Sequence, residues 1–298
     1  MKISTKFEGR ITYAFFVAPA LCIYLFVMAF PAGFSIWLSM TNYIGGAVFG
    51  NPNIRFNGLR AYQNIFSDQY FYMALRNNIL IVFISVFGQI PLGFCIAYII
   101  NRGLIKGSGL FQTIIYLPQV ISAVIIGVLF NVFFLSSQSV WMEIRRFFNP
   151  EAQWLPGQNA MLPVLAVILW MYTGTYMLIF LANLQKIDSS IIEASKIDGA
   201  TEFQTLRFII FPALSGVIVT AAILAISGSL RSFDLIWIMT GGGPAHRTSV
   251  LAIYMYEKAF RGAPNYPVAN AISTVMVIIS FILIGITKFA EKRFSSGE

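Results

Sequence analysis

The chain has 298 residues, of which 57% are hydrophobic and only 11% are charged, and its mean hydropathy is +0.74. An average soluble domain has about 25% charged residues, so the composition excludes an ordinary soluble domain and indicates a membrane protein. The formal net charge of +8 is explained by basic residues that flank membrane spans and face anionic headgroups, so it does not indicate nucleic-acid binding.

Long apolar runs are the main structural signal in the sequence. A membrane core about 30 Å thick requires roughly 20 mostly apolar residues per helix, and six runs meet this requirement. In chain order they are residues 13–38, 79–100, 111–135, 161–182, 213–230 and 268–289. Each run is too long and too uniformly apolar for a barrel strand. The sequence therefore predicts an all-α, polytopic membrane protein with six transmembrane helices in one transmembrane domain, residues 1–298.

The first run follows basic residues but is far longer than the roughly 7 to 15 apolar residues of a secretory signal, so we expect a retained helix. Pro19 and Pro31 each remove one backbone hydrogen bond from it, which predicts a kink or a break. Cys22 and Cys95 lie within apolar runs without metal-ligand spacing. They are interpreted as small buried hydrophobic residues.

Basic residues beside the runs favour one orientation slightly. With a cytoplasmic amino terminus, 11 of the 20 Lys and Arg residues fall on the inner face. In this orientation the fifth run leads to the outer surface, where ATP is not available.

A glycine run follows there, in the stretch TGGGPAHRTS at residues 240–249. A phosphate-binding loop needs a lysine and a hydroxyl directly after its last glycine, whereas Pro244 and Ala245 stand there, so this run is not a nucleotide site. Two interpretations remain: a tight turn before a short helix near 250–260, or a rigid surface on which an external protein docks. The single histidine, His246, is interpreted as a surface residue of this loop.

Residues 183–212, between the fourth and fifth runs, predict two short helices. Asp188 is the expected N-cap of the first helix, and Gly199 is expected to end it in the left-handed conformation. Thr201 and Gln204 have the spacing of a capping box that starts the second. One face of the first helix carries isoleucines and small residues, which suits a groove on another protein. The alternative is a helix that rests on its own bundle or on the lipid interface.

This segment carries a recognisable motif. Its residues are Glu193, Ala194, Ser195, Gly199, Ile209, Phe211 and Pro212. The motif resembles the cytoplasmic loop of permease subunits of binding-protein-dependent ABC importers, whose pattern is E-A-A, three residues, G, nine residues, I, one residue, L-P. Ser195 replaces an alanine and Phe211 a leucine, which keeps a small and an apolar residue. Residues 17–43, 56–66 and 233–260 resemble the first of the two permeases in maltose-type and glycerol-phosphate-type importers.

The resemblance implies a fold, a location and partners. The fold would be that of a type I ABC importer permease, in the bacterial cytoplasmic (inner) membrane with both termini cytoplasmic. The partners would be a second homologous permease, two cytoplasmic ATPase subunits and an extracytoplasmic solute-binding protein. The chain itself would be no enzyme and would bind no cofactor or metal, because its partner ATPase subunits use the ATP and Mg.

The resemblance also implies site residues. Residues 183–212 would be the cytoplasmic coupling loop, and its contacts with the ATPase would come from Glu193, Ala194, Ser195, Asp198, Gly199 and Ala200. Glu193 would act as a charged contact or as a helix cap. The alternative is that it lies on a solvated helix face. The binding protein would dock on Gly241, Gly242, Gly243 and Pro244.

Polar residues within the runs are candidates for a solute pathway. They are Tyr172, Thr173, Thr175 and Tyr176 in the fourth run, Ser227 and Ser229 in the fifth, and Asn270, Ser273 and Thr274 in the sixth. Aromatic rings beside hydroxyls suit sugars, which stack and hydrogen-bond. The alternative is that these side chains only pack helices together. Arg231 and Asp234, spaced i, i+3, are expected to form a local ion pair.

Other function classes fit less well. A secondary carrier would usually need intramembrane carboxylates, and Asp and Glu are absent from the interiors of the runs. A membrane enzyme would need a nucleophile, a carboxylate pair or a metal cluster, which one histidine and two cysteines do not supply. A permease of the same architecture for a non-sugar solute, such as glycerol phosphate, remains an open alternative.

Overall fold

The computed structural model describes residues 4–48, 50–135, 140–148 and 160–295, and most of these residues are helical. The chain divides into two compact units. The first consists of Met1–Asp68 and Met255–Val275, and the second of Gln69–Tyr254 and Met276–Glu298. The prediction of an all-α fold is confirmed.

The first unit contains the helices at the start of the chain. They are α1 (Ser4–Tyr24), the π-helical turn η1 (Leu25–Ala29), α2 (Phe30–Ser39) and α3 (Arg60–Ser67). Helices α15 (Leu251–Phe260) and α16 (Tyr266–Ser295) each contribute residues to this unit. Within it, Ser35 Oγ donates a hydrogen bond of 2.6 Å to Asn270 Oδ1, and Lys258 pairs with Asp68 at 3.1 Å.

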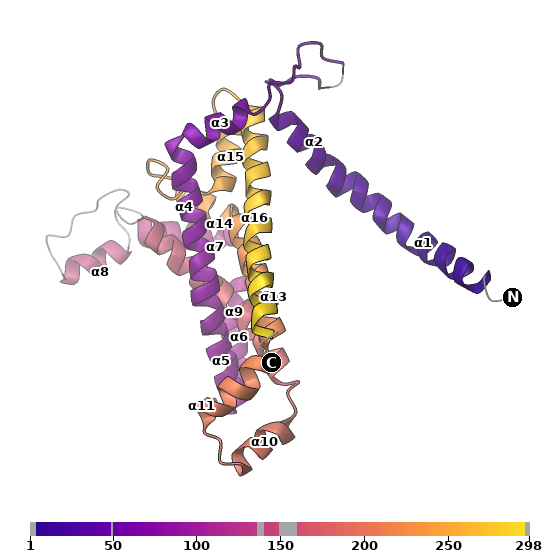
Figure 1. The fold of residues 1–298 in the computed structure, drawn as a ribbon. Helices are drawn as coiled ribbons and strands as arrows, with labels where there is room; N and C mark the ends of the chain where they lie inside the picture. The colour runs from indigo at the N-terminus through magenta and orange to yellow at the C-terminus, as the bar shows by residue number, and fades with distance from the viewer. Residues whose placement is uncertain (1–3, 49, 136–139, 149–159, 296–298) are drawn as a thin grey trace. The chain divides into compact units, whose positions relative to one another are not determined.

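The second unit holds the remaining helices (Figure 1). Before the fourth apolar run they are α4 (Gln69–Ile84), η2 (Ser85–Gln89), α5 (Ile90–Asn101), α6 (Ser108–Val120), α7 (Ala123–Phe130), η3 (Asn131–Leu135) and α8 (Val140–Phe148). They continue with α9 (Met161–Leu184), α10 (Ser189–Ile197), α11 (Glu202–Thr205), η4 (Leu206–Ile210), α12 (Phe211–Ala213), α13 (Ser215–Leu230) and α14 (Asp234–Thr240).

Helix α9 is the centre of the second unit, and two glycines set how closely its neighbours approach. A Cβ atom on Gly93 of α5 would lie 2.7 Å from Tyr176 Cβ, and one on Gly174 of α9 would lie 2.5 Å from the carbonyl oxygen of Ile115 on α6. Real Cβ atoms do not tolerate such distances, so only glycine allows these helix pairs to touch backbone to backbone. Helices α5, α9 and α6 therefore pack as one tight group.

Four of the predicted spans are continuous helices of sufficient length and apolarity: Thr12–Ser39, Gln69–Asn101, Met161–Leu184 and Tyr266–Phe289. The other two are bent pairs. Glu202–Ala213 and Ser215–Leu230 meet at 67°, and Ser108–Val120 and Ala123–Phe134 meet at 89°. The described residues therefore contain four spans, or up to six if each bent pair counts as one.

The predicted span over 111–135 is a bent pair of helices rather than one straight helix. Ile121 is extended, and Ser122 begins a new helix as the N-cap of α7 by accepting a hydrogen bond from the amide of Val124. Pro118, three residues before Ile121, lacks the amide that would bond to the preceding turn. Apolarity continues through this bend, which is why hydropathy alone does not detect it.

Three helices accommodate a proline with a π-helical turn instead of a break. The residue directly before each of Pro31, Pro91 and Pro212 donates its amide to the carbonyl five residues earlier. A wider turn accommodates the proline ring, which would otherwise collide with the carbonyl four residues back. The first run thus continues through Pro31 as one span, and the predicted kink takes the form of this turn.

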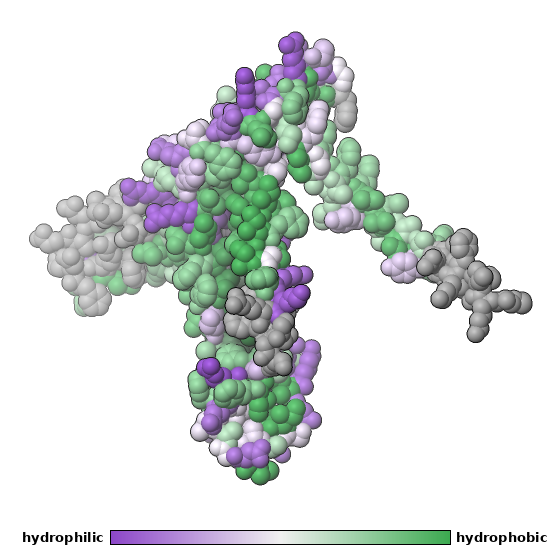
Figure 2. Space-filling view, viewed as in Figure 1, coloured by the Kyte–Doolittle hydropathy of each residue, from purple (hydrophilic) through white to green (hydrophobic). Residues whose placement is uncertain are grey.

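Apolar side chains cover much of the exposed surface of the helices (Figure 2). Cys22 and Cys95 are both exposed, so the prediction that they are buried is wrong. Positions that face lipid are as apolar as positions in a core, and the composition of a run does not distinguish the two.

Candidate functional site

A cavity of about 190 Å³ lies in the second unit among α4, η2, α9, α13 and α14. Its polar lining residues are Ser85, Gln89, Tyr172, Tyr176, Ser229, Arg231, Ser232 and Asp234. Phenol rings, hydroxyls and an amide thus face one space within a mostly apolar helix group. This mixture suits a small polar solute with apolar faces.

Three of the predicted pathway residues, Tyr172, Tyr176 and Ser229, line this cavity. Thr173 does not: it is buried, and its hydroxyl donates to the carbonyl of Leu169 in its own helix. Ser227 is half-buried outside the lining. The fourth and fifth runs therefore contribute to the cavity through the subset of their hydroxyls that faces it.

The predicted residues of the sixth run, Asn270, Ser273 and Thr274, belong to the first unit. Asn270 accepts the hydrogen bond from Ser35 and donates to the carbonyl of Tyr266 at 2.8 Å. Thr274 donates to the carbonyl of Asn270, and Ser273 is half-buried. The contacts of Asn270 fit the alternative that it packs two helices together.

The expected ion pair between Arg231 and Asp234 does not form. The two side chains, both within the described residues, are not within ion-pair distance, and Arg231 Nε donates instead to the carbonyl of Ser227 at 3.2 Å. The i, i+3 spacing brings side chains together only in a continuous helix. Here α13 ends at Leu230 and α14 begins at Asp234, so Arg231 lies between two helices.

Ser232 and two residues of η2, Ser85 and Gln89, also line the cavity and were not predicted from the sequence. Ser85 and Gln89 are both buried in this π-turn. Gln89 Nε2 donates to the carbonyl of Ile168 at 2.8 Å, and Ser229 Oγ donates to Ser85 Oγ at 3.1 Å. The signal that the sequence offered for these two residues was an amide and a hydroxyl inside an apolar run, a few residues before Pro91.

The predicted caps of residues 183–212 are confirmed. Asp188 caps α10 by accepting the amide of Ser190 at 2.9 Å, and this hydrogen bond lowers the pKa of the Asp188 carboxyl. Gly199 has a φ of +80° after the helix. Thr201 and Gln204 form the capping box of α11. Figure 1 shows α10 beyond the C-terminal end of α5, with α11 beside that end.

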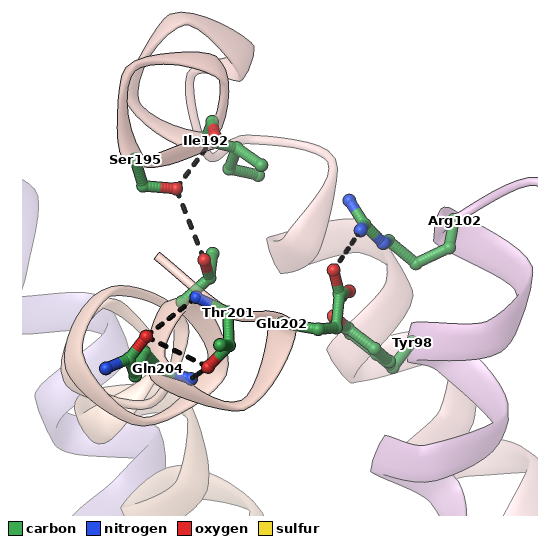
Figure 3. Close-up of polar contacts among 8 residues, drawn as sticks. Tyr98, Arg102, Ile192, Ser195, Thr201, Glu202 and Gln204 are labelled. Carbon is green, nitrogen blue, oxygen red and sulfur yellow. Dashed lines mark hydrogen bonds and ion pairs between the residues drawn. The ribbon is translucent and has the colours of Figure 1, made fainter. Parts of the chain in front are cut away.

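The candidate coupling residues differ in exposure. Glu193, Ala194, Asp198 and Gly199 are exposed, and Ala200 is half-buried. Ser195 is buried: its hydroxyl donates to the carbonyl of Ile192 at 2.8 Å and lies 3.2 Å from Thr205 Oγ1 (Figure 3). Ser195 therefore faces α11, and the free apolar side of α10 comes from Ile191 and Ile197, of which Ile197 is 86% exposed.

Sequence reasoning also missed the contact that joins the second short helix to α5. Glu202, at the start of α11, accepts hydrogen bonds from the hydroxyl of Tyr98 and the guanidinium of Arg102 (Figure 3). Arg102 also lies 5.9 Å from the centre of the Tyr98 ring. We call these three residues the Glu202 cluster. Glu202 lies about a hundred positions from its two partners in the sequence, and no local pattern indicated this pairing.

The glycine run forms a turn between α14 and α15, and the predicted short helix near 250–260 is confirmed as α15. Gly241 and Gly242 have φ values of +60° and +79°, and the Gly243–Pro244 bond is cis. Thr248 Oγ1 donates to the carbonyl of Gly243 at 2.8 Å. Helix α14, which lies between α13 and this turn, was not predicted. His246 is half-buried, with its ring centre 4.4 Å from that of Tyr70, so it is more enclosed than a surface residue.

Two buried asparagines of α4 hold the end of this turn. Asn77 Nδ2 donates to the carbonyls of Arg247 and Ser249 at 2.9 and 2.8 Å. Asn78 Nδ2 donates to the carbonyl of Ser229 at 3.0 Å, and Asn78 Oδ1 accepts the amide of Leu251 at 2.7 Å. The asparagines thereby join α4 to the turn, to the end of α13 and to the start of α15.

The glycine-run turn and the coupling loop contact opposite ends of one helix. Gln69–Asn101 is a continuous helix of 33 residues, which spans about 50 Å at 1.5 Å per residue. The turn contacts it at Asn77, and Glu202 contacts it at Tyr98 and at Arg102 just beyond its last residue. A membrane core about 30 Å thick fits between these contacts.

Comparison with known proteins identifies the family. Residues 89–296 match the family described as binding-protein-dependent transport system inner membrane component. The lactose transport system permease protein LacF of Rhizobium radiobacter is 31% identical, with 93% of each chain covered. The multiple sugar-binding transport system permease protein MsmF of Streptococcus mutans is 30% identical, covering 99% of this chain and 97% of the relative.

Solved structures show the same fold. A bacterial ABC transporter involved in the import of the acidic polysaccharide alginate matches with a TM-score of 0.77 and 20% identity, covering 98% of this chain and 99% of its counterpart. The family match covers more than half of this chain, and the relatives cover nearly all of it. The chain therefore belongs to the binding-protein-dependent transport system inner membrane components, the permease subunits of ABC importers.

Proposed function

We propose that this chain forms half of the translocation pathway of a sugar importer in a bacterial cytoplasmic membrane, with a second homologous permease forming the other half. The observation that carries the proposal is the cavity, because its tyrosine rings and hydroxyls suit the apolar faces and hydroxyls of a sugar. Its two charged residues, Arg231 and Asp234, have opposite signs, which favours a neutral solute over glycerol phosphate. Sugar permeases among the relatives support the same substrate class.

In this proposal the coupling loop docks on one of two cytoplasmic ATPase subunits, which use ATP and Mg, while the chain itself hydrolyses nothing. The contact residues are Glu193, Ala194, Asp198, Gly199 and Ala200. Ser195 contributes indirectly, by holding α10 on α11. The exposed Ile191 and Ile197 of α10 support the proposal, because an apolar helix face of this kind suits a groove on another protein.

The glycine-run turn, with Gly241, Gly242, Gly243 and Pro244, is proposed to face the outside and to dock the solute-binding protein. Its location at the opposite end of the Gln69–Asn101 helix from the coupling loop supports this placement. We also propose that both chain termini are cytoplasmic.

The first experiment is affinity purification of the tagged chain from its native membrane, with mass spectrometry of the bound proteins. We expect a second six-span permease and a nucleotide-binding subunit. The purified complex is then reconstituted with its binding protein, and uptake of labelled lactose, maltose and trehalose is measured. A chain recovered alone as a homo-oligomer would refute the importer.

Residues of the cavity are tested separately from assembly. Tyr172→Ala, which removes a ring from the cavity lining, is expected to raise the sugar concentration for half-maximal uptake while partner subunits stay bound. Tyr116→Ala, on α6 outside the lining, is the matched control. Equal uptake by both variants would argue against this cavity as the pathway.

A further inference from the structure

The Glu202 cluster joins the coupling loop to α5 by side chains alone. Glu202 stands in the first turn of α11, and Arg102 stands at the C-terminal end of α5. A negative charge is favourable at a helix N-terminus and a positive charge at a C-terminus, so each charge also suits its own helix. The contact therefore links two helix ends whose dipoles and charges are complementary.

We propose that Glu202 is a positioning residue, which transmits movement of the coupling loop to α5 through Arg102 and Tyr98. This inference rests on the proposed coupling of residues 183–212 to an ATPase. The loop reaches the cavity by two routes. The main chain leads through η4 and α12 into α13, whose Ser229 lines one side of the cavity. The Glu202 cluster leads into α5 and, through it, to the other side.

The second route is stiff along its length. Helix α5 is continuous with η2, whose Gln89 lines the cavity and is bonded to the carbonyl of Ile168 on α9. Gly93 lets α5 contact α9 directly at Tyr176, another cavity residue. Phe94 of α5 also stacks on Phe211 of α12, with ring centres 5.0 Å apart. That apolar contact resists separation, whereas the charged cluster fixes how α11 is placed along α5.

Stability alone does not account for the cluster. Glu202 and Arg102 are 52% and 23% exposed, and ion pairs at this exposure contribute little to folding because water and salt screen them. Its removal is therefore expected to leave the fold and the ATPase contact intact. Removal of the cluster would instead abolish the coordination between the two sides of the cavity. A measurement of that coordination therefore distinguishes this inference from a purely structural role.

The experiment follows α5 directly in the purified complex with its partner subunits. Cys22→Ser leaves Cys95, an exposed residue of α5, as the single thiol of this chain, and the partner subunits are prepared without cysteine. An environment-sensitive fluorophore on Cys95 reports the response to Mg-ATP, and ATP hydrolysis is measured in the same sample. In Glu202→Gln we expect hydrolysis to continue and the Cys95 response to fall about fivefold or more, a typical allosteric coupling.

Two further variants protect the test against misfolding. Tyr98→Phe removes only one hydroxyl and is expected to give a smaller loss in the same direction. Because the members act together, the Arg102→Gln and Glu202→Gln double variant should be no worse than Glu202→Gln alone. The matched control is Glu143→Gln, which breaks an exposed pair with Arg146 inside α8 and should leave the response unchanged.

The outcomes separate this inference from the proposed function. A parent complex that binds no ATPase or hydrolyses no ATP refutes the proposed coupling itself. A parent complex that hydrolyses ATP with no Cys95 response, or an unchanged response in Glu202→Gln, overturns the role of the Glu202 cluster alone. Additive losses in the double variant overturn it as well.

Discussion

Asn78 offers a quantitative test of how the second unit is held together. Its side chain is completely buried and bridges the carbonyl of Ser229 and the amide of Leu251. In Asn78→Ala both backbone groups lose this partner. A buried group left without a partner costs about 1–3 kcal/mol, whereas a hydrogen bond lost inside a membrane averages only about 0.6 kcal/mol. The first effect applies to the amide of Leu251 at the start of α15, which has no other hydrogen bond among the described residues, whereas the carbonyl of Ser229 keeps the amide of Ser232 at 3.3 Å.

We therefore expect Asn78→Ala to destabilise the chain by about 1–3 kcal/mol. At roughly 2 °C per kcal/mol for a chain of this size, the Tm falls by about 2–6 °C. The assay is the fraction of monodisperse protein that survives heating in detergent, measured by size-exclusion chromatography.

The matched control is Asn183→Ala. Asn183 Nδ2 donates at 2.8 Å to the carbonyl of Ile179 in its own helix, and that carbonyl also accepts the ordinary helical bond. This substitution leaves no backbone group without a partner, so the Tm should change by less than about 2 °C. Equal shifts in both variants would refute the reasoning.

Three other predictions concern local geometry and charge. Gly93→Ala should abolish recovery of folded protein, because the new Cβ would collide with Tyr176, while Gly109→Ala, with open space around it, should not reduce the yield. Gly199→Val should reduce uptake, because the φ of +80° at this position costs a β-branched residue about 1–2 kcal/mol, whereas the space around Gly199 is open and causes no clash. Asparagine adopts this conformation more readily, so Gly199→Asn should recover uptake. The lowered pKa of Asp188 means that its cap stabilises α10 at neutral pH and is lost as pH falls through that pKa. Faster amide exchange in α10 should therefore appear at acid pH in the parent chain but not in Asp188→Asn; the same acid response in both would contradict this.

Local chemistry made parts of the fold predictable. Asp188, Gly199 and the capping box at Thr201 act on neighbouring residues, so their spacing in the sequence was sufficient to place both helices of the coupling loop. Long apolar runs likewise located four continuous spans. These features depend on the solvent and on a few adjacent residues.

Contacts distant in sequence were not predictable in the same way. The bend at Ser122 lies inside an unbroken apolar run, and Ser195 was placed on a partner-facing side although it faces Thr205. Asn77 and Glu202 acquire their roles only from groups about one hundred residues or more away. Tyr172 and Ser229 were identified by residue type, whereas Thr173 of the same type points elsewhere, because only packing decides which hydroxyls face a cavity.

The π-turn before Pro91 has a geometric consequence for the whole second span. One extra residue in a turn rotates every later side chain by about 100° about the helix axis, since each residue of an α-helix advances by that angle. In an unbroken α-helix Ser85 would share its face with positions 92, 96 and 99, whereas Gly93, Ala97 and Ile100 are buried, each one place later. A single deletion within 85–89 would turn Gly93 away from α9, and the damage would appear about one to two turns from the lost residue.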